Sequence, residues 1–272
     1  MNDVAYEKAL ITGASAGLGV EFARQIAPKA RRLVLVARRE DRLLHLCAEL
    51  MAAHPNLEEI DIRPVDLANE TERAGLAHEI AARGDIDLLV NNAGLGDYGE
   101  FAHADWAKTA QMLAVNITAL THLAHAVLPG MTARRRGGII NVSSLAGEIF
   151  IPDFAAYAAT KAYVTRFSEA LRMEVKDAGL RVVAVCPGPV PTEFGEVAQR
   201  GGEKKKDPPL YRWMYSTAET VAREGLAALE AGRPQVFPSW RVRLAAAGIR
   251  ALPLPLKRAV LSRRPRRASP NA

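Results

Sequence analysis

A short apolar run near the start of the chain leads through a glycine-rich turn into an amphipathic stretch. The run is Ala9–Ile11, the turn is TGASAGLG at 12–19, and the helical pattern covers Val20 to about Ala27. In this order, glycines let a pyrophosphate approach backbone N–H groups, and the helix N-terminus favours its negative charge. No Gly-Lys-Ser/Thr follows, which excludes a P-loop for this turn. We expect a nucleotide to bind there, with a purely structural turn as the alternative, at Gly13, Ser15, Gly17, Leu18 and Gly19.

The alternation of apolar runs and amphipathic stretches continues along the chain. It predicts strands at 31–37, 59–65, 86–90, 138–142 and 181–185, and helices at 41–53, 69–83, 105–128 and 152–178. Strands that alternate with helices are typical of an α/β fold with a parallel sheet covered on both faces. Ligands of such a sheet bind at the carboxyl ends of its strands.

The strand at 31–37 ends in two arginines, Arg38 and Arg39. The end of this strand meets the adenosine ribose in a dinucleotide fold, where an acidic residue suits a 2′-hydroxyl and an arginine suits a 2′-phosphate. The sequence therefore predicts NADP(H) rather than NAD(H), with Ser15 adding a hydroxyl to the phosphate site. Solvated charges at a strand end are the alternative.

Further candidate nucleotide-binding residues follow later strands. Asp66, with Leu67, either caps the next helix or accepts from the adenine amino group. The run Asn92-Ala93-Gly94 comes after the strand at 86–90. Its small residues would let a cofactor lie on the backbone.

A tyrosine and a lysine four positions apart lie in the predicted helix 152–178. Tyr157 and Lys161 share one helix face. An ammonium beside a phenol favours the phenolate and lowers its pKa from about 10. The pair is a candidate acid/base, and Ser144 is expected to hold the oxygen that exchanges the proton. Asn116 is unfavourable inside a helix and suggests a polar task or a core hydrogen bond.

Composition and charge exclude several other classes. The 272 residues suffice for one large domain, with 49% hydrophobic and 24% charged residues. Removing the nine basic residues of 241–272 leaves 27 basic against 30 acidic residues, so a nucleic-acid-binding face on the body is not supported. Two cysteines and the pair His122 and His125 give no metal-ligand spacing, so no metal is expected. With no signal peptide and no stretch of about 20 apolar residues, we expect a cytoplasmic protein.

These motifs resemble, in their order, those of the short-chain dehydrogenase/reductase family, in its compact single-domain branch. The match covers about residues 6–240 and rests on TGASAGLG at 12–19, NNAG at 91–94, Asn116, Ser144, Tyr157-AAT-Lys161 and Pro187-Gly188. The three-residue gap between Gly13 and Gly17 disfavours the family's extended branch of sugar-nucleotide epimerases. The resemblance implies a Rossmann-type, doubly wound, seven-stranded parallel sheet whose last strand is 235–238.

The resemblance also implies chemistry and partners. It implies hydride transfer between nicotinamide C4 and a carbonyl carbon, with Tyr157 as proton donor and Ser144 bonded to the substrate oxygen. Lys161 would bind the nicotinamide ribose beside Tyr157, and Asn116 would support a proton-relaying water. The carboxamide would be fixed at Pro187, Gly188, Val190 and Thr192. Association into a homodimer or homotetramer through the helices 105–128 and 152–178 is expected.

The substrate itself is less constrained by the sequence. A flap is expected at about 193–216, around a charged GGEKKKDPP hinge, with Phe150, Ile151 and Phe154 lining the same pocket. Its aromatic and apolar side chains favour a lipophilic ketone or alcohol, unless they only pack the flap: Phe194, Tyr211, Trp213 and Met214. A broad carbonyl reductase is the first hypothesis, a 3-oxoacyl thioester reductase the second, and a non-catalytic NADP-binding sensor the third.

The segment 241–272 is predicted to be a basic, amphipathic extension of a single catalytic domain at 1–240. Apolar residues alternate there with arginines, and Pro253 and Pro255 interrupt the pattern. Three roles remain open: contact with an anionic membrane surface, contact with a partner subunit, or a disordered basic end from Arg263 onward.

Overall fold

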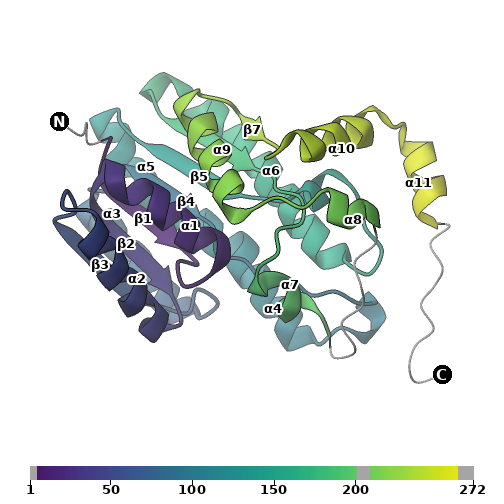
Figure 1. Ribbon diagram of the computed structural model, residues 1–272, viewed down its shortest axis with the longest axis horizontal. Helices are drawn as coiled ribbons and strands as arrows, with labels where there is room; N and C mark the ends of the chain where they lie inside the picture. The colour runs from purple at the N-terminus through teal and green to yellow at the C-terminus, as the bar shows by residue number, and fades with distance from the viewer. Residues whose placement is uncertain (1–4, 201–208, 263–272) are drawn as a thin grey trace.

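A parallel sheet forms the centre of the computed structural model, which describes residues 5–200 and 209–262. Its seven strands follow the order β3-β2-β1-β4-β5-β6-β7 (Figure 1). Their bounds are β1 Tyr6–Thr12, β2 Ala30–Ala37, β3 Glu59–Pro64, β4 Leu88–Asn91, β5 Gly138–Val142, β6 Arg181–Val185 and β7 Gln235–Val236. The predicted Rossmann-type fold is confirmed, although β7 ends two residues earlier than expected. The strand order reverses between β1 and β4, where a doubly wound sheet opens a crevice.

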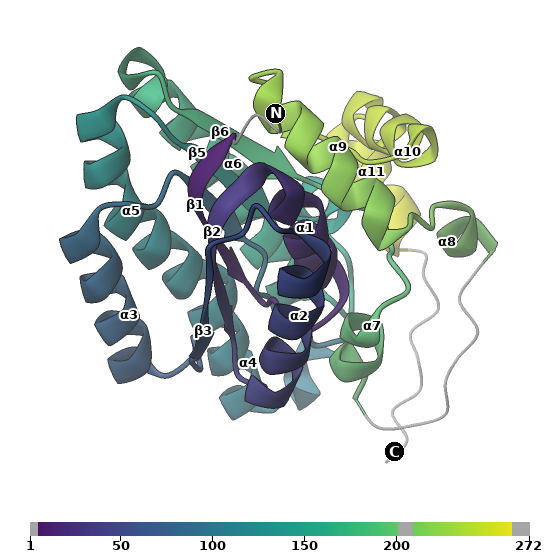
Figure 2. The same ribbon diagram turned by 60° about the vertical axis from the view of Figure 1, so that its left-hand side comes forward.

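Helices cover both faces of the sheet, as Figure 2 shows. One face carries α1 (Gly17–Ile26), α2 (Glu40–Ala53) and α9 (Ala218–Glu230), packed in one core cluster. The other carries α3 (Glu70–Arg83), α5 (Leu120–Arg134) and α6 (Ala155–Val175) in a second cluster. Strands between two helical layers are buried on both sides, which explains their continuous apolar runs.

The helix predicted at 105–128 is longer and less regular than expected. It comprises α4 (Trp106–Leu113), a π-helical segment at Ala114–Ala119 and α5, so the predicted end at residue 128 is wrong. In the described part of the chain, 106–134 is the one helical stretch long and apolar enough to cross a bilayer, but half of its most apolar window is buried. A core helix of a globular domain has the same character.

Other helix ends also differ slightly from the prediction. Helix α6 starts at Ala155 and ends in a 3-10 turn at Lys176–Ala178. Asn69, and not Asp66, caps α3, because its side chain accepts from the amides of Thr71 and Glu72. The remaining 3-10 turns are Ala27–Lys29, Phe101–His103 and Leu145–Glu148.

Four helices lie outside the two layers that cover the sheet: α7 (Glu193–Ala198) and α8 (Pro209–Trp213) between β6 and β7, and α10 (Trp240–Ala251) and α11 (Leu254–Ser262) after β7. Helices α7 and α8 lie within the expected flap, whose hinge at 201–208 falls outside the described residues. Helix α10 buries Val242 and Ala246 against Leu145, and α11 buries none of its residues. The body therefore holds α10 firmly, while the domain boundary at 240 stays a prediction.

Candidate active site

The turn between β1 and α1 requires glycine at three positions. Gly13 and Gly17 have φ of 66° and 54°, in the left-handed region that side chains disfavour. A Cβ on Gly19 would lie 2.1 Å from the carbonyl oxygen of Gly13. The turn therefore keeps its backbone free of side chains at the start of a helix, where anions bind.

Thr12 and Asn92 join this turn to the end of β4. The Thr12 hydroxyl accepts from the amides of Asn92 and Ala93, each at 3.0 Å. The Asn92 side-chain amide donates to the carbonyl oxygen of Thr12 at 2.9 Å. The Asn92 side chain therefore fixes the shape of the loop. Thr12 does so too, and the sequence did not single it out.

Gly94 lies where Lys161 and Asn116 meet. A Cβ at Gly94 would lie 3.4 Å from Lys161 Nζ and 3.5 Å from Asn116 Oδ1. Three residues from separate parts of the chain therefore meet just after β4, at the carboxyl edge of the sheet.

The side chain of Asn116 is buried and fully hydrogen-bonded. Its amide donates to the carbonyl of Leu95 at 2.9 Å and to Thr160 Oγ1 at 3.0 Å, while its oxygen accepts from the amide of Leu95 at 2.8 Å. Asn116 lies in the π-helical segment, a feature that re-aims side chains and is frequent at functional sites. The core hydrogen bond that the sequence analysis weighed is present, and Thr160 is a partner that it missed.

Tyr157 is enclosed by aromatic rings. Its ring stacks on Phe154 at 4.2 Å between centroids and contacts Phe194 at 5.6 Å, and its exposed fraction is 6%. Burial raises the pKa of Tyr157 well above its usual value, and a hydrogen bond with Ser144 offsets this only in part. This direction is opposite to the one expected from Lys161, whose Nζ lies 5.8 Å from the ring centroid.

Ser144 and Lys161 flank the end of β5. The Ser144 hydroxyl accepts from the amide of Ala146 at 3.1 Å, at the start of the turn Leu145–Glu148. Lys161 Nζ donates to the carbonyl of Val142 at 2.9 Å, and burial lowers the pKa of Lys161 to about 8. The predicted set Asn116, Ser144, Tyr157 and Lys161 is thus brought to one edge of the sheet.

At the adenosine end, Arg39 lies beside the glycine turn. Its Nε donates to Ser15 Oγ at 3.3 Å, and its Nη1 pairs with Glu193 at 2.9 Å. Arg42 pairs with the same carboxylate at 2.7 Å, which the sequence analysis missed. Arg38 is exposed and makes no ion pair within 5–200 and 209–262. Of the two predicted arginines, only Arg39 is therefore tied to Ser15.

The remaining predicted cofactor residues lie at strand ends. Asp66 Oδ1 accepts from the amide of Ala68 at 3.0 Å, and Leu67 is buried in the second core cluster. Thr192 contacts the glycine turn, because a Cβ on Gly17 would lie 3.1 Å from its methyl group. It follows β6 through Pro187, Gly188 and Val190.

The aromatic residues expected in the substrate pocket separate into two groups. Phe154 and Phe194 contact Tyr157 directly, whereas Trp213 packs edge-on against Trp240 of α10 at 5.7 Å between centroids. Met214 packs with Leu145 and Val242. Phe150 is exposed. Phe154 and Phe194 are therefore the predicted pocket residues whose rings contact Tyr157, and Tyr211 lies near enough to help raise the pKa of Tyr157.

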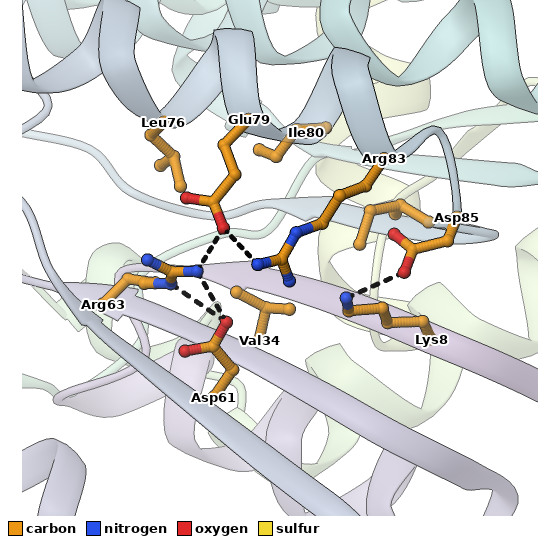
Figure 3. Close-up of a pocket in the computed structure, with 10 residues that line it drawn as sticks. Lys8, Val34, Asp61, Arg63, Leu76, Glu79, Ile80, Arg83 and Asp85 are labelled. Atoms are coloured by element: carbon orange, nitrogen blue, oxygen red, sulfur yellow. Dashed lines mark hydrogen bonds and ion pairs between the residues drawn. The ribbon is translucent and has the colours of Figure 1, made fainter.

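A small cavity lies far from these residues, between β3, α3 and the start of β1 (Figure 3). It measures about 20 Å³, room for roughly one water. Asp61 and Glu79 share the guanidinium of Arg63, and Lys8 pairs with Asp85 at 2.9 Å. The charged side chains around this cavity pair with one another, so we assign it no ligand.

A sequence model described as short chain dehydrogenase matches residues 7–201. The chain belongs to this family. Its members include an NADP-dependent 3-hydroxy acid dehydrogenase of Schizosaccharomyces pombe, which is 33% identical over 80% of this chain and 83% of its own.

Solved structures of the short-chain dehydrogenase family agree with the fold. An enzyme of Sphingobium yanoikuyae, solved in complex with NADPH, has a TM-score of 0.78 and 26% identity over 98% of this chain and all of its own. The bulky-bulky ketone specific alcohol dehydrogenase of Comamonas testosteroni has a TM-score of 0.75 and 27% identity over 97% of this chain and 96% of its own. The chain is thus similar to these dehydrogenases almost from end to end, including the region of α10.

Proposed function

We propose that this protein is an NADP(H)-dependent oxidoreductase that interconverts a carbonyl and a secondary alcohol, with Tyr157 as its general acid/base. One observation carries the proposal: Asn116 and Lys161 both lie beside Gly94, which follows β4. Tyr157 is on the same helix as Lys161, and Ser144 follows the neighbouring strand β5. A structural helix face would not need a buried lysine and a buried asparagine at the sheet's ligand-binding edge.

The four side chains have distinct tasks in this proposal. The Tyr157 hydroxyl donates its proton to the substrate oxygen during reduction, and the raised pKa keeps it in the protonated form that reduction requires. Ser144 hydrogen-bonds the same oxygen and orients it. Lys161 holds the ribose of the nucleotide, and Asn116 fixes the loop at Leu95 and supports proton exchange with water. The bound nicotinamide supplies or accepts the hydride.

The preference for NADP(H) is supported by Ser15, Arg39 and Arg42, which gather hydroxyl and guanidinium donors beyond the end of β2. Guanidinium groups bind phosphate through paired hydrogen bonds. The glycine turn leaves room for the pyrophosphate. The solved relative from Sphingobium yanoikuyae was captured with NADPH, which agrees with this assignment.

A lipophilic carbonyl compound is the proposed substrate class, because Phe154 and Phe194 surround Tyr157. The Comamonas testosteroni relative acts on bulky-bulky ketones, in line with this class. The second candidate is reduction of a 3-oxoacyl thioester, in line with a very-long-chain 3-oxoacyl-CoA reductase of Mycosarcoma maydis that is 29% identical over 85% of this chain and 65% of its own. A non-catalytic NADP sensor is disfavoured, because the chain has a complete set of catalytic side chains.

A parallel activity screen tests this proposal. The full chain is assayed with NADPH and with NADH against bulky ketones, keto-steroids, 3-oxoacyl thioesters and small polar sugars. The proposal expects oxidation of NADPH with an apolar ketone or thioester, and much slower oxidation of NADH. Turnover confined to polar sugars contradicts the substrate class, and nucleotide binding without any turnover supports the sensor.

Subunit association through the helices at 106–134 and 155–175 is part of the proposal. Trp106 and Met173 are exposed by 68% and 63% on these helices, and Tyr163 is partly exposed. Exposed aromatic and methionine side chains are enriched at interfaces. Light scattering should give a dimer or tetramer, and Met173→Glu should shift it toward smaller species; a wild-type monomer contradicts this part.

Contact of the tail with an anionic membrane surface is a separate proposal. Leu256 and Val260 of α11 are exposed by 52% and 62%, and Lys257 and Arg258 lie between them. Basic charge with exposed apolar side chains favours anionic lipid. Full-length protein should sediment with phosphatidylserine vesicles more than a chain ending at Pro253, which keeps α10. Equal sedimentation contradicts membrane contact and favours the other two roles of the tail, contact with a partner subunit or a disordered basic end.

A further inference from the structure

The side chain of Glu193 occupies both arginines of the proposed phosphate site. Glu193 Oε2 accepts from Arg39 at 2.9 Å, and Oε1 accepts from Arg42 at 2.7 Å. Arg39 follows β2 and Arg42 lies in α2, whereas Glu193 is the first residue of α7. A carboxylate from the flap therefore stands where the ribose 2′-phosphate is expected to bind.

The next residue of the same helix closes over Tyr157. The ring of Phe194 lies 5.6 Å from that of Tyr157, and a Cβ on Gly96 would lie 2.9 Å from Phe194 Cζ. Phe194, with 37% of its surface exposed, thus packs between the loop after β4 and Tyr157. Two consecutive residues of α7, Glu193 and Phe194, therefore contact the arginines of the adenosine end and the ring of Tyr157.

The far end of this helix is fixed more firmly than its beginning. Arg200 pairs with Asp97, whose side chain is 3% exposed, and Gln199 forms a β-bridge with Tyr98. The Glu193 side chain, in contrast, is 47% exposed. Exposed ion pairs are weak and exchange readily, whereas a buried carboxylate is costly to leave unpaired. The N-terminal end of α7, with Glu193, is therefore the end that can move away from Arg39 and Arg42.

We propose that Glu193 is a specificity-determining latch: the 2′-phosphate displaces it from Arg39 and Arg42 and thereby moves Phe194 off Tyr157. A phosphate carries up to two negative charges and three acceptor oxygens, so it competes effectively with one carboxylate for two guanidinium groups. A nucleotide without the 2′-phosphate leaves the latch closed. The inference rests on the proposed NADP(H) function and adds a coupling between cofactor identity and access to the pocket.

Two fragments of the cofactor test the latch without catalysis. 2′,5′-ADP carries the 2′-phosphate and 5′-AMP lacks it, and neither has a nicotinamide. Calorimetry is done on the full-length wild type, on Glu193→Gln and on Glu40→Gln. Glu40 is a matched control, since it lies next to Arg39, is exposed and makes no ion pair among the residues with described positions.

The latch predicts that 2′,5′-ADP, and not 5′-AMP, binds more tightly to Glu193→Gln than to the wild type. Glu193→Gln should bind 2′,5′-ADP roughly three- to tenfold more tightly than the wild type, because two exposed ion pairs no longer compete. Its affinity for 5′-AMP, and both affinities of Glu40→Gln, should change by less than about twofold. Equal affinity of wild type and Glu193→Gln for 2′,5′-ADP overturns the latch, and so does an equal gain in Glu40→Gln.

Amide hydrogen exchange of the peptide at 194–199 reads the release itself. In the wild type, 2′,5′-ADP should speed this exchange and 5′-AMP should not. In Glu193→Gln the exchange should already be fast and should not respond. Unchanged exchange in the wild type at saturating 2′,5′-ADP overturns the coupling to Phe194.

Failure of the latch can be distinguished from failure of the proposed NADP(H) site. If 2′,5′-ADP binds well but Glu193 has no influence, the latch fails and the NADP(H) site stands. If no variant binds 2′,5′-ADP and the wild type does not oxidise NADPH, the nucleotide assignment fails together with the latch.

Discussion

Lys161 donates a hydrogen bond from Nζ to the backbone carbonyl of Val142 at 2.9 Å, with only 4% of the residue exposed. This contact holds an amine between α6 and the end of β5, next to Gly94 and Asn116. Burial disfavours its charged form and lowers its pKa to about 8. The amine at the centre of the site therefore titrates close to neutral pH, which has a measurable consequence for stability.

Between pH 8 and 10.5, Lys161 should make the protein more stable as the pH rises. In this window the folded state has lost the proton while the unfolded state, with the ordinary value of 10.5, retains it. The unfolded state binds more protons, so the free energy of unfolding increases with pH. The gain should be about 1 to 3 kcal/mol.

Urea unfolding of the wild type and of Lys161→Met at several pH values isolates this contribution. Groups common to both proteins cancel in the difference between their unfolding free energies. The wild type should gain on the mutant from pH 8 to 10. A difference independent of pH means that the folded amine titrates normally.

Asn116→Ala should destabilise the protein and also reduce turnover. The substitution leaves the amide and carbonyl of Leu95 without their buried partners, which costs about 1–3 kcal/mol. Thr118→Ala is the control, because Thr118 lies in the same π-helical segment but is exposed. Thermal melts and kcat/KM are measured for both. A normal melt for Asn116→Ala would show that the loop finds other partners.

Arg39→Ala and Arg42→Ala should each weaken NADPH binding roughly 10- to 100-fold, as expected for loss of a charge-assisted hydrogen bond. NADH binding should hardly change. Arg38→Ala should affect neither nucleotide, because Arg38 is exposed and is not tied to Ser15. Fluorescence titration with both nucleotides checks this. Loss of NADPH affinity in Arg38→Ala alone would restore the sequence-based assignment of that residue.

Arg250→Gln should loosen α10 and lower activity without changing nucleotide binding. Arg250 Nε pairs with Glu148 at 2.8 Å, in the turn that begins just after Ser144. Burial raises the pKa of Glu148, but Arg250 and Gln235 outweigh it and hold the pKa below its usual value. This stabilisation is present above the ordinary pKa of the carboxyl and is lost as the pH falls through the lowered one.

The measurement is the thermal melt and kcat of Arg250→Gln beside Arg258→Gln. Arg258 lies on α11, makes no ion pair in the described ranges and should be replaceable. We expect a loss of about 1 kcal/mol for Arg250→Gln, discounted because half of that side chain is exposed. Equal behaviour of the two variants would mean that α10 does not support the Ser144 turn.

The sheet could be predicted because its information is local. Runs such as β5 and β6 are mostly apolar and mostly buried, and the turn at 12–19 has glycine where the backbone has positive φ or no room for a Cβ. Asn116 could be singled out because its residue type is unfavourable in a helix. The end of the helix at Arg134 was missed, because Pro129 is accommodated inside α5.

Contacts between distant segments could not be predicted. Glu193 lies 154 residues from Arg39 and 151 from Arg42, so no spacing connects them. The raised pKa of Tyr157 has the same origin: the i,i+4 spacing to Lys161 was visible in the sequence, but the enclosure by Phe154 and Phe194 was not. Desolvation depends on the folded surroundings, which reverse the direction expected from the local pair.

The account depends most on the Tyr157 hydroxyl, and single-turnover reduction of a substrate by NADPH tests it directly. Tyr157→Phe is compared with Tyr163→Phe. The second change removes a hydroxyl from the same helix, one that is hydrogen-bonded to Thr121 at the surface. Tyr157→Phe should melt normally and bind NADPH, yet transfer hydride roughly 10²- to 10⁴-fold more slowly, while Tyr163→Phe matches the wild type. Hydride transfer by Tyr157→Phe at close to the wild-type rate would contradict the account.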